Sequence, residues 1–284
     1  MDFLIYISLS LNHVQVVDDV VLSIVSSCHA LRYLYLSGCY ILRNLRISHA
    51  QLVGIKVRRC YRLKSISIRA EKIKSFSYIG RRVHVVYECA PVLRELNICY
   101  VNGWGPHSPL NFLGAFPELK MLALQFPSRL QVSCVLLHTG KFAGLKEIAL
   151  GVMTSWKKSI RFVALVLKAA PLVETLTVDA RGNIRPLKNL KIRWTKNSAA
   201  TRLRTIRIRG FSGESELLQL LFFLLRSSPV LKTLLIDTGR VRGKNRAFLD
   251  FKRPEDAVRC NFAREVAQTH LAPNVPSTVK LSIM

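Results

Sequence analysis

The sequence predicts an α/β solenoid in which a parallel β-sheet forms one face. A leucine-type residue is followed at three and five residues by two more, and this pattern occurs twelve times in 284 residues. The last two apolar residues of each copy lie on the same side of a short strand, because strand side chains alternate. One copy cannot bury its apolar side alone, so neighbouring copies are expected to stack with aligned strands. The copies begin at residues 31, 42, 52, 63, 73, 93, 119, 145, 173, 187, 203 and 231.

The spacing of the copies predicts two kinds of leucine-rich repeat. The first five begin 10 or 11 residues apart, which leaves no room for a helix. Two such steps make about 21 residues, the length of one solenoid turn, so alternate copies are expected on opposite walls. From residue 93 onward the copies begin 26 to 30 residues apart, with an extra one at 187. We therefore expect a leucine-rich-repeat solenoid with short helix-less repeats in its N-terminal part and helix-containing repeats in its C-terminal part.

The N-terminal part is expected to begin with a helix at about residues 17–27, before the first strand. Its inward side chains are predicted to be Val20, Val21, Ile24 and Val25. Residues 1–16 show no repeat, so the sequence indicates a lead-in outside the solenoid.

Two helices are predicted between the later repeats. Apolar residues recur at helical spacing from Trp156 to Leu167, in a helix that must end before Pro171. The second helix covers residues 215–226, where nearly all-round apolarity predicts deep burial. Its acidic start and basic end suit the helix dipole.

The C-terminal segment is predicted to be a helix followed by a strand. Pro254 fits the first helical position, and apolar residues then recur four residues apart. That stripe consists of Val258, Phe262 and Val266, and the alternating residues of the strand are Val279, Leu281 and Ile283. The predicted domains are thus a solenoid over residues 17–248 and a closing cap over residues 249–284.

Composition limits the structural class and the subcellular location of the protein. Half of the residues are hydrophobic, which argues against disorder, and no apolar run approaches the roughly 20 residues that span a bilayer. Asp2 stands where a signal peptide carries positive charge, and no Asn-x-Ser/Thr acceptor occurs. The seven cysteines show no metal-binding spacing, so they are expected to be buried reduced thiols. We expect a cytoplasmic or nuclear protein that has no membrane partner.

The net charge is +26, from 43 Lys and Arg against 17 Asp and Glu. Residues 41–82 hold 12 basic and 1 acidic residue, and residues 181–246 hold 16 and 3. Many basic residues alternate with core residues, so they are expected to form basic stripes on the sheet face. Such stripes attract acidic proteins, phosphorylated segments and nucleic acid. The alternative interpretation is a solvated face whose charge mainly aids solubility.

The residues predicted to contact a partner are aromatic or basic and stand beside core positions. They are Tyr33, Tyr35, Arg46, Lys56, Arg58, Arg69, Lys191, Arg193, Arg207 and Arg209. The expected partner is an acidic or phosphorylated protein, and the alternative is nucleic acid, with affinity that falls as salt rises. The histidines are scattered, no glycine-rich phosphate loop occurs, and no cofactor or metal site is indicated. We therefore expect a binding protein and not an enzyme.

Several segments resemble one protein family. The run from Ser27 to Cys39 resembles a cysteine-containing leucine-rich repeat, and Ile73 to Gly80 resembles the step that closes the short repeats of plant F-box/LRR proteins. The end of the chain resembles that family's FBD-like tail. Three more segments resemble its entry into a strand, with Pro before the leucine pattern: residues 90–96, 170–176 and 228–234.

This resemblance implies a substrate-recognition subunit of a Skp1–cullin–F-box ubiquitin ligase. In that family the repeats hold the target, and the F-box docks on a Skp1-like adaptor. The Leu-Pro step that opens an F-box is not found in residues 1–30. Three interpretations follow: a receptor whose F-box is missing from this sequence, a repeat-only relative that binds partners without the ligase, or a truncated fragment without independent function.

Overall fold

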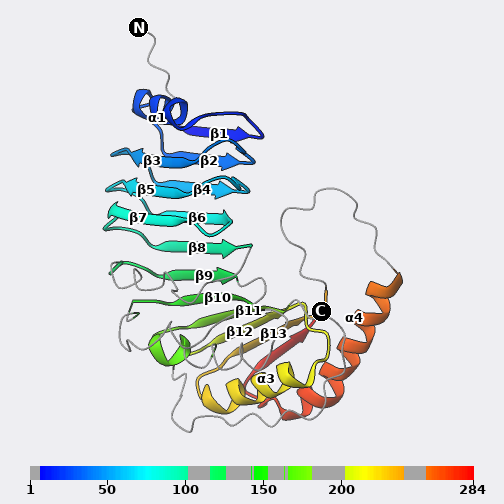
Figure 1. Ribbon diagram of the computed structural model, residues 1–284. Coiled ribbons are helices and arrows are strands. Elements are labelled where there is room, and N and C mark those ends of the chain that lie inside the picture. The colour runs from blue at the N-terminus through cyan, green and yellow to red at the C-terminus, as the bar shows by residue number, and fades with distance from the viewer. Residues whose placement is uncertain are drawn as a thin grey trace. The chain divides into compact units, whose positions relative to one another are not determined.

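The computed structural model describes residues 7–101, 116–125, 142, 144–152, 163, 166–180, 202–239 and 254–284 (Figure 1). The chain forms two compact units, unit 1 over Met1–Pro127 and unit 2 over Ser128–Met284. Both units are built on parallel strands, and described helical residues occur near the start of the chain, at residues 163 and 166–169, and in the C-terminal part of unit 2. The α/β solenoid predicted from the repeats is confirmed.

Unit 1 contains two parallel sheets that take alternate strands of the chain. The larger sheet has the order β1-β2-β4-β6-β8-β9, and the second sheet has the order β3-β5-β7. Residues 33–100, all of which the structure describes, contain no helix, so the short repeats are helix-less and alternate between two walls, as predicted. The strands of the larger sheet are β1 (Ser8–Asn12), β2 (Tyr33–Ser37), β4 (Gly54–Arg58), β6 (Ser75–Gly80), β8 (Glu95–Tyr100) and β9 (Met121–Gln125). Those of the second sheet are β3 (Asn44–Ser48), β5 (Ser65–Arg69) and β7 (His84–Cys89).

The register of the strands stacks the apolar residues in columns. One column runs through Leu34, Ile55, Phe76, Leu96 and Leu122, which occupy matching positions in five neighbouring strands. All five are at most 2% exposed. Burying such a side chain contributes about 1.5–3 kcal/mol, so the repeated leucine pattern is the main source of cohesion in unit 1.

Aromatic side chains fill the interior where the leucine pattern changes. Tyr78 and Tyr100 meet edge to face with their ring centres 5.9 Å apart. Burial raises the pKa of Tyr100 to about 12, since the interior disfavours its charged form. The Tyr78 hydroxyl donates a hydrogen bond of 2.6 Å to the Arg81 carbonyl. Gly80 makes room for this hydroxyl, which would lie 2.5 Å from a Cβ at that position.

Helix α1 (Asp18–Ser27) packs against β3 at the start of the second sheet. The Asp18 carboxylate accepts hydrogen bonds from the backbone N–H of Arg43 at 2.8 Å and of Asn44 at 3.0 Å. Partial burial works against the charged form, but these hydrogen bonds outweigh it and lower the pKa of Asp18. Val21 and Val25 are buried, whereas Val20, predicted to face inward, is 44% exposed. The inward stripe of α1 is therefore narrower than the sequence pattern indicated.

Two strands of unit 1 were not among the predicted repeats. β1 lies within the segment interpreted as a lead-in, yet it pairs in parallel with β2 along its full length. β7 pairs with β5. Its inward residues Val85 and Tyr87 follow Val83, so the first spacing is two residues and not three, and the repeat pattern missed it.

Unit 2 contains a parallel sheet of the order β10-β11-β12-β13-β14. Helix α3 (Ser215–Ser227) connects β12 to β13, so this repeat contains a helix, as predicted. The predicted helix around Trp156 falls largely outside the described residues, as does the repeat copy at residue 187. The strands are β10 (Glu147–Val152), β11 (Thr175–Ala180), β12 (Thr205–Arg209), β13 (Thr233–Asp237) and β14 (Lys280–Ile283).

The end of unit 2 contains helix α4 (Pro254–Val266), a π-helical turn η3 (Ala267–Leu271), a 3-10 turn η4 (Ala272–Asn274) and the predicted closing strand β14. Strand β14 pairs in parallel with β13. The α4 stripe predicted from large residues is not the buried one, because Val258 is 71% exposed and Phe262 is 52% exposed.

Small residues form the buried side of this segment instead. Ala263 and Ala267 have no exposed surface, and neither has Leu271. Alanine lets a helix approach its neighbours closely, so the inward side carries little side-chain volume. Helix α3 is more apolar, with Leu217, Leu220, Leu221 and Leu224 buried, but its other side is only half-buried.

Candidate functional site

The outward side of β2, β4 and β6 in unit 1 combines aromatic, basic and small side chains. Tyr33 and Tyr35 project from β2, and Lys56 and Arg58 project from the neighbouring β4. We call these four residues the outer face. Serine and glycine occupy most of the paired positions around them, with Ile79 beside Arg58, so the long side chains project above a floor of small residues. The floor consists of Ser10, Ser37, Gly54, Ser75 and Ser77.

Contacts within the outer face hold its side chains in place. The Lys56 ammonium lies 5.8 Å from the centre of the Tyr35 ring, a cation–π distance worth about 0.5–1 kcal/mol at an exposed site. Tyr33 lies against Gly54, where an added Cβ would be 3.0 Å from the Tyr33 Cδ1 and 2.9 Å from the Ser75 Oγ. Tyr33 nevertheless remains 49% exposed. The face therefore offers aromatic and cationic groups that are partly ordered before any partner binds.

The turns that follow β1, β2 and β4 share one backbone feature. His13, Gly38 and Arg59 each follow the last strand residue and have φ angles of 55°, 64° and 54°. Left-handed backbone of this kind is rare outside glycine. The Gly38 N–H donates to the Arg58 carbonyl at 2.9 Å, and the Arg59 N–H donates to the Ile79 carbonyl at 2.7 Å. Each strand therefore ends at an equivalent position, and the first turn residue still makes a backbone hydrogen bond to the neighbouring strand.

Aromatic and basic side chains from these turns and from the turn after β6 form a row. The Tyr40 and Tyr61 rings are stacked, with centres 6.4 Å apart and planes inclined by 24°. The His13 ring meets Tyr40 edge to face at 5.8 Å, and the Arg81 guanidinium lies 5.9 Å from the centre of the Tyr61 ring. We call His13, Tyr40, Tyr61 and Arg81 the rim ladder. Its two tyrosines are exposed, and it lies directly beyond the C-terminal ends of the strands that carry the outer face.

Buried cysteines anchor the two tyrosines of the rim ladder. Cys39 precedes Tyr40 and Cys60 precedes Tyr61, and neither thiol has any exposed surface. The Cys60 thiol lies 3.4 Å from the Arg58 carbonyl, to which it donates. Burial raises the pKa of Cys60 to about 12 and also raises that of Cys39. Both thiols stay protonated at neutral pH, which makes them packing groups and poor nucleophiles.

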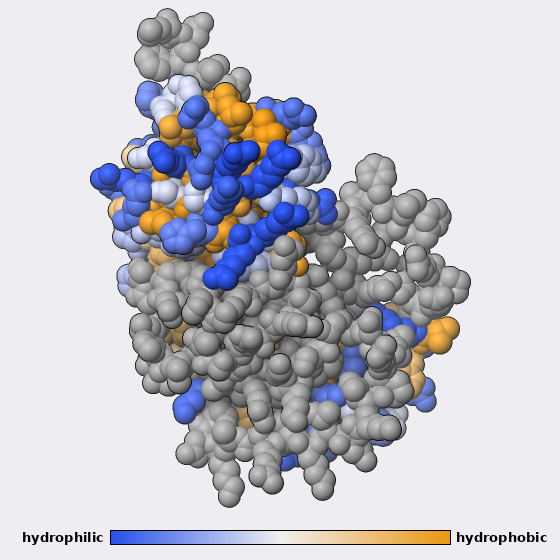
Figure 2. Space-filling view, viewed as in Figure 1, coloured by the Kyte–Doolittle hydropathy of each residue, from blue (hydrophilic) through white to orange (hydrophobic). Residues whose placement is uncertain are grey.

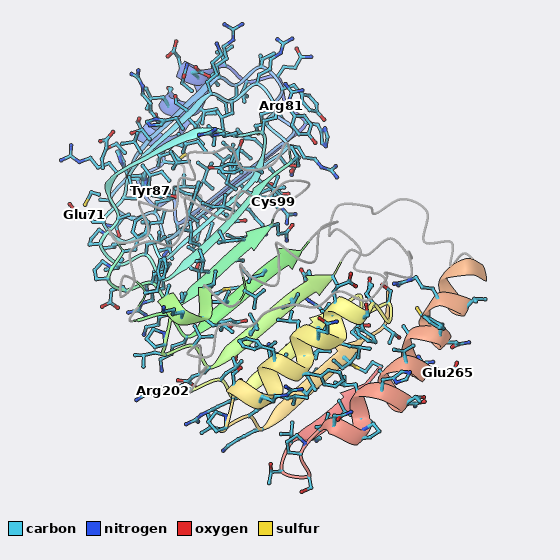
Figure 3. All side chains as sticks on the ribbon, turned by 60° about the horizontal axis from the view of Figure 1, so that its bottom comes forward. Glu71, Arg81, Tyr87, Cys99, Arg202 and Glu265 are labelled. Atoms are coloured by element: carbon cyan, nitrogen blue, oxygen red, sulfur yellow. The ribbon has the colours of Figure 1, made fainter. Side chains whose placement is uncertain are left out.

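Positive charge is concentrated around the rim ladder. The turns at residues 38–43, 59–64 and 81–83 contain no Asp or Glu. Figure 3 shows Arg81 and Glu71 on opposite sides of unit 1, and Figure 2 shows hydrophilic side chains gathered over the part of unit 1 that carries β2 to β6. The basic residues of the three turns are Arg43, Arg59, Arg62, Lys64, Arg81 and Arg82.

The predicted contact residues do not form a single surface. Tyr33, Tyr35, Lys56 and Arg58 come together on the outer face, but Arg46 and Arg69 lie on β3 and β5 of the second sheet. The short repeats alternate between walls, so basic residues of successive copies point to different surfaces. Lys191 and Arg193 lie outside the described residues.

The two predicted residues of unit 2 differ in their surroundings. Arg207 is exposed on β12 between Thr177 of β11 and Leu235 of β13. Arg209 forms an ion pair with Asp179, with 2.6 Å between Nε and Oδ1. Because the Asp179 side chain is only 10% exposed, Arg209 has an internal partner and contributes less free charge than its position suggested.

The rim ladder was missed in the sequence because its residues lie in turns, outside the leucine pattern. A signal was present, since the pair Cys39-Tyr40 recurs as Cys60-Tyr61, one solenoid turn later. Equivalent positions in successive turns stack in a solenoid. An aromatic residue that recurs at the repeat length therefore predicts a row of rings.

Two buried glutamates of unit 2 lie at the start of α3. Glu214 and Glu216 are both buried beside the first turn of the helix. Glu214 accepts hydrogen bonds from the Ser212 hydroxyl and, at 3.3 Å, from the Ser212 backbone N–H.

Across the described part of the chain, no group of three or more His, Cys, Asp or Glu residues is placed to hold a metal ion. No described helix is long and apolar enough to cross a membrane.

The fold and the repeats agree with a comparison against known families. The family described as "At1g61320/AtMIF1, LRR domain" matches residues 4–284. The chain belongs to this family. The match begins ahead of β1 and extends through β14, so the family's domain includes both the first strand and the C-terminal helix and strand. No curated protein matches the sequence.

Proposed function

We propose that the chain is a protein-interaction module that binds an acidic or phosphorylated segment of a partner protein on the outer face of unit 1, without catalysing a reaction. The observation that carries this proposal is the arrangement of Tyr33, Tyr35, Lys56 and Arg58 above a floor of serine and glycine. Leucine-rich-repeat solenoids use extended sheet surfaces for binding. Exposed tyrosine supplies contact area at low entropic cost, and the cations attract a negative partner.

An extended segment fits the dimensions of this surface. Each residue of an extended chain covers about 3.3 Å, while neighbouring strands are about 4.8 Å apart, so a few partner residues cross the strands that carry the outer face. Carboxylates on such a segment would meet Lys56 and Arg58, and its apolar parts would pack on Tyr33 and Tyr35. The two kinds of contact together give both attraction and area.

Charge reversal on one wall at a time tests this proposal. A fluorescent glutamate-rich peptide is titrated with the whole chain, and anisotropy reports binding. Lys56→Glu is expected to weaken binding by about tenfold, the loss of one favourable charge contact and its replacement by repulsion. The matched control Arg46→Glu makes the same type of change on the second sheet and should leave the affinity unchanged. Equal losses in both variants would show that only the net charge of the protein attracts the peptide.

The cellular role that we propose for this module is target recognition in a Skp1–cullin–F-box ubiquitin ligase. The resemblance of residues 73–80 and of the Pro-containing strand entries to plant F-box/LRR proteins supports it. The setting would be the cytoplasm or the nucleus. The test is the intact mass of the endogenous protein and its co-purification with a Skp1-like adaptor. If the endogenous protein carries no F-box and retains no adaptor, the proposed ligase role is wrong and the proposed binding function stands.

Nucleic acid is the second candidate partner, and the net charge of +26 favours it. Binding to nucleic acid releases counterions, so the affinity would fall steeply with salt. A short oligouridine in the same anisotropy assay separates the two candidates. If the oligonucleotide binds more tightly than the glutamate-rich peptide, and if Lys56→Glu weakens both equally, the protein-binding proposal is wrong.

A further inference from the structure

The rim ladder is a built surface and not a set of independent side chains. Two of its members, Tyr40 and Tyr61, follow cysteines that have no exposed surface. Arg81 is held from the other side, because the buried Tyr78 hydroxyl donates to its carbonyl at 2.6 Å. These contacts hold the backbone of the three residues, and the ring and cation–π contacts of the ladder order their side chains, so less freedom is lost when a ligand binds.

The ladder combines aromatic rings, two tyrosine hydroxyls and one guanidinium group, and the Tyr40 hydroxyl lies 3.4 Å from the His13 Nδ1. Tyr40 and Tyr61 face each other, Arg81 lies over Tyr61, and His13 packs against Tyr40. Proteins that bind single-stranded nucleic acid need ring faces on which bases can stack. In the ladder those faces are already occupied by its own members, which argues against base stacking as its purpose.

The charge around the ladder fits a dianion. Its turns contain six Lys and Arg residues and no acidic residue, and of the six Arg43 lies beside the Asp18 carboxylate of α1. Arg62, Arg81 and Arg82 are exposed there, and arginine binds phosphate with paired N–H donors. A phosphate group carries about −1.5 to −2 charge and three acceptor oxygens, so it gains more from several such donors than a carboxylate does.

The outer face leads directly into this surface. Arg58 is the last residue of β4, and Arg59 begins the turn that continues to Tyr61 and Arg62. A segment that crosses the strands of the outer face runs alongside this row, so one of its side chains can point along the strands toward the rim.

We infer that the rim ladder, together with Arg62 and Arg82, is a phosphate-binding site that recognises a phosphorylated Ser or Thr in a partner segment. This inference rests on the proposed function, because it takes the rest of the segment to lie on the outer face. The ladder supplies specificity for phosphate, and the outer face supplies general attraction for acidic protein.

The test compares two fluorescent peptides of the same glutamate-rich sequence, one with a single phosphoserine and one with serine. The whole chain is expected to bind the phosphopeptide about tenfold more tightly, the effect of charge-assisted hydrogen bonds to one phosphate. Arg62→Gln with Arg81→Gln should remove this preference while the serine peptide keeps its affinity. Arg46→Gln with Arg69→Gln makes the same charge change on the second sheet and should preserve the preference. Circular dichroism of each variant verifies that it is folded.

A second variant pair tests the ladder itself. Tyr40→Phe with Tyr61→Phe keeps the stacked rings and removes the hydroxyls, so it should reduce the preference for phosphate in part. Equal affinity for the two peptides in the native chain would overturn the inference and leave the proposed function standing. If the native chain binds neither peptide, both proposals are wrong. Competition by oligouridine that exceeds competition by free phosphoserine would assign the rim to nucleic acid instead.

Discussion

Gly38→Ala is expected to destabilise unit 1 through both backbone strain and a side-chain clash. Gly38 has a φ of +64°, a conformation that costs a non-glycine residue roughly 1–2 kcal/mol. An added Cβ would lie 2.8 Å from the His13 Nδ1 and 2.9 Å from its Cε1, so the imidazole must move. The His13 ring would then lose its edge contact with Tyr40 at 5.8 Å, worth about 0.5–1.5 kcal/mol.

Together these effects predict a loss of about 2–3 kcal/mol in the free energy of unfolding. Urea denaturation followed by circular dichroism measures it. In a His13→Ala background the clash is absent, so Gly38→Ala should cost only the backbone part, roughly 1–2 kcal/mol. Arg59→Gly is the matched control, because Arg59 already has a φ of 54°, and it should cost no more than about 0.5 kcal/mol. A Gly38→Ala variant as stable as the native chain would refute the reasoning.

Three further predictions concern buried or hydrogen-bonded groups. Asp18→Asn should weaken the attachment of α1 to β3 by about 1–3 kcal/mol, because the backbone N–H groups of Arg43 and Asn44 lose a charged acceptor. Since the folded-state pKa of Asp18 is lowered, the stability of the native chain should also fall as pH decreases through that pKa. Acid titration of the melting temperature would show this fall in the native chain and not in the variant. The Cys60 thiol, whose pKa burial raises to about 12, should resist iodoacetamide at about pH 8 until urea unfolds the chain; labelling at native conditions, measured by mass spectrometry, would contradict its burial. Burial raises the pKa of Tyr100 from the ordinary value of 10.0 to about 12 in the folded protein. The stability that the Tyr100 hydroxyl contributes should therefore be intact below about pH 10 and decline as pH rises toward 12. A tyrosinate absorbance that rises at the ordinary pKa for every tyrosine would disprove this.

The sequence was sufficient for the architecture because the repeats are periodic. The leucine spacing placed β2 to β6 and the helix-containing repeat with α3, and the step of 10 or 11 residues predicted the alternation between two walls. It failed where a strand departs from the period, as at β7, or precedes the first copy, as at β1. The inward side of α4 was mistaken because small residues such as Ala263 pack there, and alanine carries little weight in a hydrophobic pattern.

The candidate site was only partly predictable. Alternation along β2 and β4 was enough to place Tyr33, Tyr35 and Lys56 on one surface, because strand side chains alternate. The predicted alternation of walls separates Arg46, in the copy that begins at residue 42, from these residues, but the contact residues were chosen by residue type alone, and Arg46 lies on the second sheet. Turn residues are positioned by backbone conformation and by stacking between repeats. The contact between Tyr40 and Tyr61 therefore required the structure.

The most direct test of the central claim maps where an acidic segment lies on the chain. Acetylation of lysines is followed by mass spectrometry with and without the bound glutamate-rich phosphopeptide. Lys56 is exposed on the outer face, and Lys72 is exposed in the turn between β5 and β6, where its Nζ lies 2.8 Å from the Gln51 Oε1. Binding on the outer face predicts that the peptide slows acetylation of Lys56 and leaves the rate at Lys72 unchanged. Equal protection of the two lysines, or protection of Lys72 alone, would contradict it.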